Sequence, residues 1–324
     1  MTIIVGYQPD KGGRSSLELA TLLAQSGRKE PLAVVTVVPQ HWSTPSMAKV
    51  DGEYADWANQ QGKAALATAQ AYLAAKHPEV EVSFHQVSGR SIQSALLQAC
   101  KDLGGDLLVL GSSSDGRVGQ VVIGSTAEPL LHSSDVPIAI APRGYRTGAA
   151  GRLTRLTCSF SGTQESKDLL LATAQMSLRV GGRLRIVTFG VRGRTMYPPE
   201  VGLRAEDMVL QSWTEQVTAD QEQAVELLRG YGLLPEHTTK AIATGASWVD
   251  VMDELEWEPG EVLVVGSSPI GPLARVFLGS RAIKIVRYSP VPVVVVPAGI
   301  AKEEAADAVE AAAEAGPAQT PPSR

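Results

Sequence analysis

Cysteine is scarce in this chain, with two residues among 324. Cys100 lies in an apolar segment with helical spacing, Cys158 lies in an apolar segment typical of a strand, and neither belongs to a Cys-x-x-Cys pair. Such positions predict buried free thiols. A redox or metal-binding role for cysteine therefore has little support.

The chain also lacks a long apolar run. A membrane-spanning helix needs about 20 apolar residues in succession, and no segment approaches that length. The sequence opens on the strand-like residues Thr2-Ile3-Ile4-Val5, without the charged and apolar regions of a secretory signal. We therefore expect a cytoplasmic protein that does not associate with a membrane.

Basic residues are not in excess. The chain has 29 Lys and Arg against 34 Asp and Glu, which gives a net charge of −5. Residues 301–324 carry five acidic and two basic side chains, so they contribute −3 and leave −2 for the rest. A nucleic-acid-binding surface needs clustered Lys and Arg, so we expect no nucleic acid partner.

Signatures of catalysis are missing as well. The five histidines are scattered, without the His-x-x-x-His spacing of metal ligands. No Gly-x-Ser-x-Gly segment occurs, and no Gly-x-x-x-x-Gly-Lys-Ser/Thr loop supplies a lysine for phosphoryl transfer. We therefore expect neither catalytic residues nor a metal site.

What the sequence does contain is one pattern that occurs twice. Gly111 and Gly124 recur as Gly266 and Gly279, and both intervals equal 155 residues (266 − 111 and 279 − 124). Each copy follows a continuously apolar segment and precedes a strand-like segment that contains Val-Pro. A period this long indicates duplication of a whole domain rather than a solenoid.

Short apolar strands alternate with helical segments through both copies. This alternation predicts an α/β protein with two tandem open, mostly parallel five-stranded sheets, each with helices on both faces in a Rossmann-like arrangement. We expect a first domain at residues 1–142, a glycine-rich linker at 143–152, a second domain at 153–299 and a disordered tail at 300–324. The irregular segment Gly190–Leu203 is interpreted as a loop insertion.

The repeated glycine loop suits a phosphate. Ligands of parallel α/β sheets bind beyond the carboxyl ends of the strands, and Gly111 directly follows such an end. Glycine lets the backbone approach a ligand closely. Gly124-Ser125-Thr126 is expected to open a helix whose first N–H groups attract an anion. Ser125 is equally suited to capping that helix, so binding and capping both stay open.

The whole pattern resembles the loop of the universal stress protein family: a strand, Gly-x-x-(Gly), nine residues, then Gly-(Ser/Thr) before a helix. Val5-Gly6-Tyr7-Gln8 and Ser159–Thr163 also look like that family's first strand and turn. The resemblance covers residues 1–142 and 153–297. It implies a tandem member with two domains of the adenine nucleotide α-hydrolase-like fold and a non-catalytic role in the stress response.

The resemblance also implies a ligand, which is ATP (with Mg²⁺) or AMP. The residues implied in the first half, with Arg117 added as a loop cation, are Gln8, Gly111, Ser112, Ser114, Arg117, Gly124, Ser125 and Thr126. The weaker second set is Ser161, Gly266, Ser267, Gly279 and Ser280.

This sequence departs from the family pattern at two points in each half. The second loop glycine is replaced by Ser114 and Pro269, and the acid that faces adenine is replaced by Gln8 and Ser161. Proline lacks an N–H and cannot adopt positive φ. We therefore expect the nucleotide in the first half and a degenerate second site.

Two other functions stay open. A nucleotide-independent interaction protein would act through edge strands such as Val293–Val296. Because matching strands join domains in the related family, we expect the two halves to pair within the chain and two chains to form a homodimer. A weak ATP-hydrolysing or adenylating enzyme is the third interpretation, although the Ser-Gly-Gly-x-Asp-Ser loop of such enzymes is missing.

Overall fold

A computed structural model of the chain describes residues 1–39, 50–113, 117–148, 151–192, 199–270 and 275–315. The first-half strands are β1 (Thr2–Gly6), β2 (Leu32–Pro39), β3 (Val82–Gly89), β4 (Gly105–Gly111) and β5 (Ile138–Ala141). The second-half strands are β6 (Arg155–Ser159), β7 (Arg183–Val191), β8 (Thr238–Gly245), β9 (Glu261–Gly266) and β12 (Val293–Val296).

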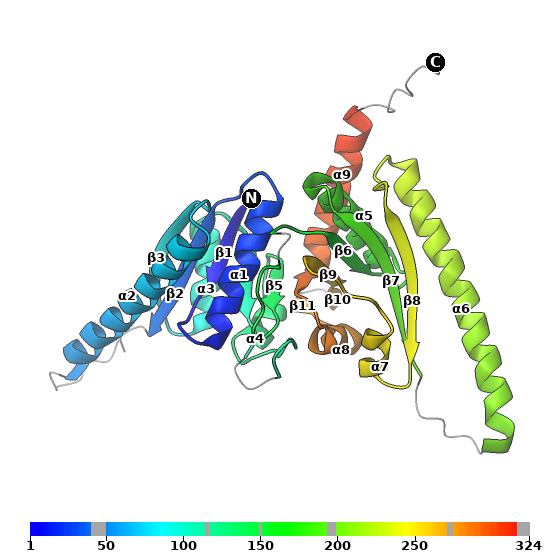
Figure 1. The fold of residues 1–324 in the computed structure, drawn as a ribbon, viewed down its shortest axis with the longest axis horizontal. Coiled ribbons are helices and arrows are strands. Elements are labelled where there is room, and N and C mark those ends of the chain that lie inside the picture. Colours follow the sequence, from blue (N-terminus) through cyan, green and yellow to red (C-terminus); the bar gives the residue numbers. More distant parts are fainter. Residues whose placement is uncertain (40–49, 114–116, 149–150, 193–198, 271–274, 316–324) are drawn as a thin grey trace.

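These strands form one continuous ten-stranded sheet in the order β3-β2-β1-β4-β5-β12-β9-β6-β7-β8 (Figure 1). Counted outward from the centre, each half has the same order, with the first strand of the half in the middle. Within each half, the strands of this sheet all pair in parallel. The predicted α/β fold with mostly parallel strands and helices is confirmed, whereas the two expected five-stranded sheets are joined into one.

The two halves meet through one antiparallel pair of strands. Ile140 of β5 lies opposite Val293 of β12, and Ala139 lies opposite Val294. Since β12 also pairs with β9, neither β5 nor β12 is a free edge. The pairing expected of Val293–Val296 is therefore made within the chain, and β3 and β8 become the outer edges of the sheet.

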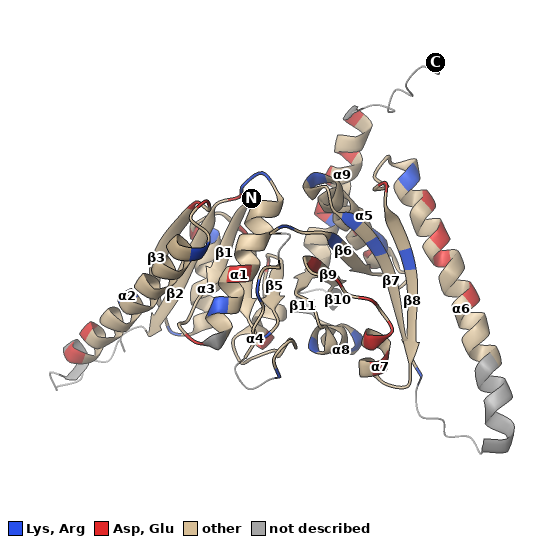
Figure 2. Cartoon of the chain, viewed as in Figure 1, with Lys and Arg blue, Asp and Glu red and all other residues tan. Residues whose placement is uncertain are grey.

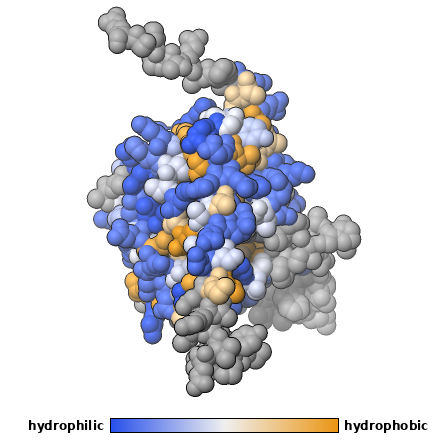
Figure 3. Space-filling view, turned by 90° about the vertical axis from the view of Figure 1, so that its right-hand side faces the viewer, coloured by the Kyte–Doolittle hydropathy of each residue, from blue (hydrophilic) through white to orange (hydrophobic). Residues whose placement is uncertain are grey.

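The face on the β8 and α6 side carries hydrophobic residues only in small separate groups, apart from the residues left undescribed (Figure 3).

Helices cover both faces of the sheet. One face carries α1 (Lys11–Ser26), α2 (Val50–Lys76), α5 (Gln164–Val180), α6 (Pro199–Gly230) and α9 (Ala298–Ala315), and the other carries α3 (Ile92–Asp102), α4 (Ala127–Leu131), α7 (Trp248–Asp253) and α8 (Ser280–Tyr288). Neighbouring strand residues alternate between the two faces, as a period of two requires: Ile3 packs in one buried cluster and Ile4 in the other.

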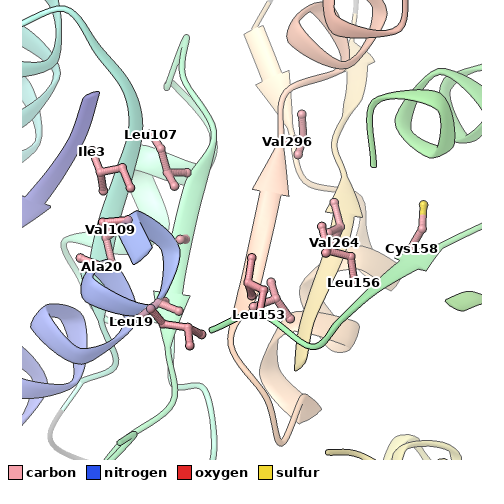
Figure 4. Close-up of a cluster of buried hydrophobic side chains, with 14 of the residues drawn as sticks. Ile3, Leu19, Ala20, Leu107, Val109, Leu153, Leu156, Cys158, Val264 and Val296 are labelled. Atoms are coloured by element: carbon pink, nitrogen blue, oxygen red, sulfur yellow. The ribbon is translucent and has the colours of Figure 1, made fainter. Parts of the chain in front are cut away.

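The first of these clusters runs across the junction. Figure 4 shows Ile3 and Leu107 of the first half and Leu156 and Val264 of the second half as members of one buried group. The two halves therefore share a hydrophobic core, in addition to their common sheet.

The C-terminal segment corrects an expectation. Residues 300–315 are not disordered but belong to α9, which packs against α5. Ala301, Ala305 and Ala308 are buried and lie at helical spacing on one face of α9. Small side chains let two helices approach closely, so an alanine-rich segment can dock here. Residues 316–324 lie outside the described part of the chain.

The segment that joins the halves is held against α1. The Thr147 backbone N–H donates to Oε2 of Glu18 (2.8 Å), and the Thr147 hydroxyl donates to the Glu18 carbonyl (3.0 Å). The Leu153 N–H donates to the hydroxyl of Ser26 (2.7 Å). The glycine-rich linker is therefore anchored at its middle and directly after its last residue.

Other boundaries differ from expectation in smaller ways. The predicted irregular piece Gly190–Leu203 is shorter, because β7 extends to Val191 and α6 begins at Pro199; residues 193–198 are not described. The helix expected from Ser125 begins only at Ala127, since Ser125 and Thr126 form a turn. The second glycine loop holds an unexpected antiparallel ribbon, β10 (Ser268–Ile270) with β11 (Arg275–Phe277).

Candidate functional site: two clefts at the carboxyl ends of the strands

Each half has a cleft where β1 or β6 and the glycine loop end. The first-half cleft has a volume of about 200 Å³, and six of the predicted residues line it: Gln8, Gly111, Ser112, Gly124, Ser125 and Thr126. Arg117 is exposed and lies outside this lining. Ser114 falls outside the described residues. Six of the eight residues of the first set therefore lie at one cleft.

The start of α1 narrows the first cleft. A Cβ atom on Gly111 would lie 2.1 Å from the carbonyl oxygen of Gly12, and one on Gly13 would lie 1.8 Å from the carbonyl oxygen of Gln8. Three glycines thus allow three backbone segments to approach within contact distance. This packing occupies space next to the glycine loop that a phosphate would need.

Ser112 is committed to the loop itself. Its hydroxyl donates to the Ala141 carbonyl (2.7 Å) and accepts from the Val122 N–H (3.1 Å), and the side chain is buried. Ser267 is the matching residue of the second half: its N–H donates to the Val296 carbonyl (3.0 Å), and its hydroxyl accepts from the Ala298 N–H (3.2 Å). Both serines therefore hold their loops in shape.

The second-half cleft is much larger, with a volume of about 690 Å³. All five residues of the second set line it: Ser161, Gly266, Ser267, Gly279 and Ser280. Its apolar walls come from several elements of the second half: Phe160, Leu169, Phe189, Val217, Val265 and Ile285.

The difference in space has a local cause. Glu165 and Ser166 stand at the start of α5, where the first half has Gly12 and Gly13 at the start of α1. With side chains there, α5 cannot approach its glycine loop as α1 does. The nearest atom to a Cβ on Gly266 would be Cδ2 of Leu169 at 3.4 Å, rather than a backbone carbonyl.

A helix N-terminus faces the second cleft. Gly279 is the N-cap of α8 and supplies no capping side chain, so the first N–H groups of the helix keep no partner within it. Arg281 lies in the first turn and lines the cleft, with Nη2 donating to the Phe189 carbonyl (2.7 Å). Backbone N–H groups, helix dipole and guanidinium together favour an anion at this end.

One wall was not foreseen from the sequence. Trp213, Gln216, Val217 and Asp220 of α6 line the second cleft. Their spacing places them on one helix face, but only the fold shows that this face covers the cleft. Figure 2 shows acidic residues recurring along the described part of α6, and Asp220 is the one that reaches the site.

Asp220 stands beside the turn that follows β6. A Cβ on Gly162 would lie 2.8 Å from Oδ2 of Asp220, and Oδ1 accepts from the Gln216 side-chain amide (2.9 Å). Gly162 has φ +78°, a left-handed conformation that suits glycine. A carboxylate from α6 therefore lies close to Ser161, which occupies the position of the family's adenine-facing acid.

The remaining candidate chemistry is limited. Within the described residues, His, Cys, Asp and Glu side chains form no group of three or more that could hold a metal ion. Cys100 and Cys158 are free and buried, as predicted, and burial raises their pKa to about 11 and about 12. In the same part of the chain, no helix combines the length and the apolarity needed to cross a membrane.

Comparison with known proteins agrees with this geometry. The model of the universal stress protein family matches residues 1–142 and 155–297. Universal stress proteins of Mycobacterium tuberculosis and Mycobacterium bovis are each 47% identical to the chain over 297 residues, which is 92% of this chain and 100% of each relative.

Solved structures show the same fold. A universal stress protein from Archaeoglobus fulgidus matches with a TM-score of 0.65 and 17% identity, over 92% of this chain and 98% of that chain. A functionally unknown protein from Pseudomonas aeruginosa matches with a TM-score of 0.54 and 13% identity, over 97% of each chain. The chain belongs to the universal stress protein family, with one domain of that family in each half.

Proposed function

We propose that this universal stress protein responds to stress by binding an adenine nucleotide, ATP or AMP, and that the second-half cleft is its principal site. The observation that carries the proposal is the difference in space. Ligand sites typically measure about 300–1,000 Å³. The second cleft, at about 690 Å³, lies in that range, and the first cleft, at about 200 Å³, lies below it. This ranking is the opposite of the one that the loop sequences favoured.

The second cleft offers a partner for each part of a nucleotide. In the proposal, phosphate lies at the N-terminus of α8 beside Arg281, because that end combines N–H donors with positive charge. The adenosine lies among the apolar walls, and Asp220 accepts hydrogen bonds from it. Asp220 thus takes over from the missing acid at Ser161.

The first cleft is the weaker candidate in this proposal. Gln8 is exposed at its lining and retains a donor and an acceptor, but the packing of Gly12 against Gly111 leaves little room for phosphate. The proposal includes binding without catalysis, and Mg²⁺ enters only with ATP. The homodimer and the cytoplasmic location remain predictions.

Titration calorimetry with ATP and with AMP tests the proposal on two matched variants, Gly279→Val and Gly124→Val. Among the described residues, no atom lies within 4 Å of a Cβ on Gly279, and the nearest to one on Gly124 is Cβ of Ser113 at 3.3 Å, so both variants should fold. We expect one dominant site per chain, weakened about tenfold or more by Gly279→Val and unchanged by Gly124→Val.

Asp220→Asn keeps the shape of the wall and should weaken AMP and ATP alike, by about tenfold, while the exposed Glu215→Gln on the same helix should not. If Gly124→Val weakened binding and Gly279→Val left it unchanged, the principal site would lie in the first half. Absence of binding at millimolar nucleotide would refute the proposal.

A further inference from the structure

A third cavity, of about 420 Å³, lies beside the start of α1 and the first glycine loop. Among the described residues, it shares only Asp10 with the lining of the first-half cleft, so the two are separate cavities. Its lining is short and strongly charged: Pro9, Asp10, Arg14, Val118, Arg143, Gly144 and Arg146.

Three arginines converge on this cavity. Arg14 comes from α1, and Arg143 and Arg146 come from the segment that follows β5. Among the described residues of the lining, Asp10 is the one acid, and its Oδ1 already accepts from the Gly13 N–H (2.7 Å) as the N-cap of α1. These described lining residues therefore carry a charge of +3 − 1 = +2, although the whole chain carries −5.

Arg14 stands at the wrong end of its helix for stability. It lies in the first turn of α1, which has no acidic residue. The N-terminus of a helix carries partial positive charge, so a cation there is unfavourable. A residue that breaks a local rule without a structural gain is more often there for function. An anion in the cavity would remove the conflict for both Arg14 and the helix.

The backbone that carries the other two arginines is fixed. The Arg143 N–H donates to the Gln120 carbonyl (3.0 Å), and its carbonyl accepts from the Gly119 N–H (2.8 Å), so the segment pairs with the glycine loop. Gly144 then turns with φ +74°, and Thr147 is anchored on Glu18. A ligand would thus meet arginines on an ordered backbone, which lowers the entropic cost of binding.

We propose that this cavity binds an oligophosphate anion, a di- or triphosphate. The planar guanidinium group presents paired donors that match phosphate oxygens, and three such groups suit several phosphates rather than one. The volume of about 420 Å³ also exceeds what a single phosphate fills. The anion is either free or carried by a nucleoside, and both share this chemistry. The site is independent of the second-half nucleotide cleft.

The test is calorimetric titration of sodium triphosphate into the full chain at low ionic strength. All proteins carry Gly279→Val, so that binding at the second-half cleft is weakened equally in every sample. The double variant Arg14→Gln/Arg146→Gln removes two exposed arginines of the cavity and should leave the fold intact. The matched control is Arg28→Gln, an exposed arginine beyond the other end of α1.

We expect the double variant to bind triphosphate about tenfold more weakly or worse, the control to bind as before, and added salt to weaken binding. The proposal is overturned if the double variant binds triphosphate as tightly as the Gly279→Val protein that keeps both arginines, or if that protein does not bind triphosphate. Repeating the titration with ADP and ATP distinguishes the sources, since a nucleoside-borne anion predicts tighter binding than the inorganic one. If the triphosphate proposal fails, the nucleotide proposal still stands, because its test compares Gly279→Val with the unaltered protein and does not involve the arginine variants.

Discussion

The two halves of this chain share one topology and differ in what their clefts can hold. Both place the glycine loop after their fourth strand, and both turn from the first strand into a capped helix. Yet the first cleft measures about 200 Å³ and the second about 690 Å³. The contrast arises at the helix start, where Gly12-Gly13 in one half faces Glu165-Ser166 in the other.

This contrast shows that a glycine can close a site as well as open one. In the first half, glycine on both the loop and the helix lets the two backbones touch. In the second half, side chains on the helix keep the two apart. A glycine loop therefore indicates where the backbone can approach something, but its sequence does not say whether that is a ligand or a neighbouring helix.

The halves also differ at the opposite ends of their strands. Gly105 opens the fourth strand of the first half and packs on Ile4, whereas Glu261 opens the matching strand of the second half. Glu261 is buried and accepts from Arg155 and Arg185, at 2.6 Å each, and from the Thr157 hydroxyl. The same strand position is thus apolar in one half and ionic in the other.

Removing the carboxylate of this cluster should have the largest effect. Glu261→Ala leaves the buried Arg185 guanidinium, which lies 4.7 Å from the centre of the Trp257 ring, without its acid. Burial already lowers the pKa of Arg185, and Glu261 opposes that shift. An uncompensated buried charge costs about 3–5 kcal/mol of unfolding free energy. Urea unfolding measures the loss.

The matched control is Glu256→Ala, since that side chain is exposed and only its backbone carbonyl bonds to the two arginines. It should change stability by less than about 0.5 kcal/mol. Hydrogen exchange should show the loosening in β6, β7 and β9 and not in the first half. A loss below about 1 kcal/mol for Glu261→Ala would show that the cluster is not a closed ionic unit.

The next effect bears directly on the two clefts. Gly13→Ala places a methyl group against the Gln8 carbonyl, where a Cβ would lie 1.8 Å away, so α1 must shift. Overpacking of this kind costs about 2–3 kcal/mol. Ser166→Ala at the matching position loses only the hydrogen bond from its hydroxyl to the Thr163 carbonyl (2.8 Å), worth about 1 kcal/mol. Thermal unfolding compares the two.

A shift of α1 should also widen the first cleft. The first cleft of Gly13→Ala is therefore expected to bind AMP more tightly than the first cleft of the unaltered protein. Equal melting temperatures for Gly13→Ala and the unaltered protein would mean that the start of α1 is not packed tightly against the turn after β1. In that case the close packing offered as the cause of the narrow first cleft would lose its support.

Local patterns were sufficient for most of the fold. The pairing of Val293–Val296 across the junction was expected from the family resemblance. The repeated interval, the short apolar strands and the helical spacing between them predicted two α/β halves, each with five mostly parallel strands. Each of these depends on period or on neighbours in the sequence. They also brought Gln8, Gly111 and Gly124 to one cleft and Ser161, Gly266 and Gly279 to the other.

What could not be predicted depends on contacts between distant segments. The alanine-rich face of α9 has helical spacing, but its partner on α5 is more than a hundred residues away. Asp220 lies beside the turn after β6, yet nothing in its own sequence neighbourhood points to that contact. The first cleft is narrow because the backbone of Gly12 contacts Gly111, and the sequence around either glycine does not predict that contact.

The smallest predicted effect again sets one half against the other. Glu18 lies eight residues after the N-cap of α1 (18 − 10), and the buried Leu171 lies eight after that of α5 (171 − 163). Glu18 accepts from the Tyr72 hydroxyl and the Thr147 N–H, and so ties α2 and the linker to α1. The same helix position is therefore a hydrogen-bonded acid in the first half and a buried apolar side chain in the second.

Stability should depend on pH through this carboxyl. Burial alone raises the pKa of Glu18, but the hydrogen bonds from Tyr72 and Thr147 outweigh it and hold the pKa below its ordinary value of 4.5. A lowered pKa stabilises the fold at pH values above the unfolded-state pKa, and that contribution disappears as the pH falls through the folded-state pKa.

Glu18→Gln should lower the free energy of unfolding by about 1–2 kcal/mol near neutral pH, with the difference shrinking below about pH 4.5. Urea unfolding at pH 7 and at acid pH measures it. The exposed Glu53→Gln should match the unaltered protein at both, and a pH-independent cost for Glu18→Gln would show that shape, not charge, holds the linker to α1.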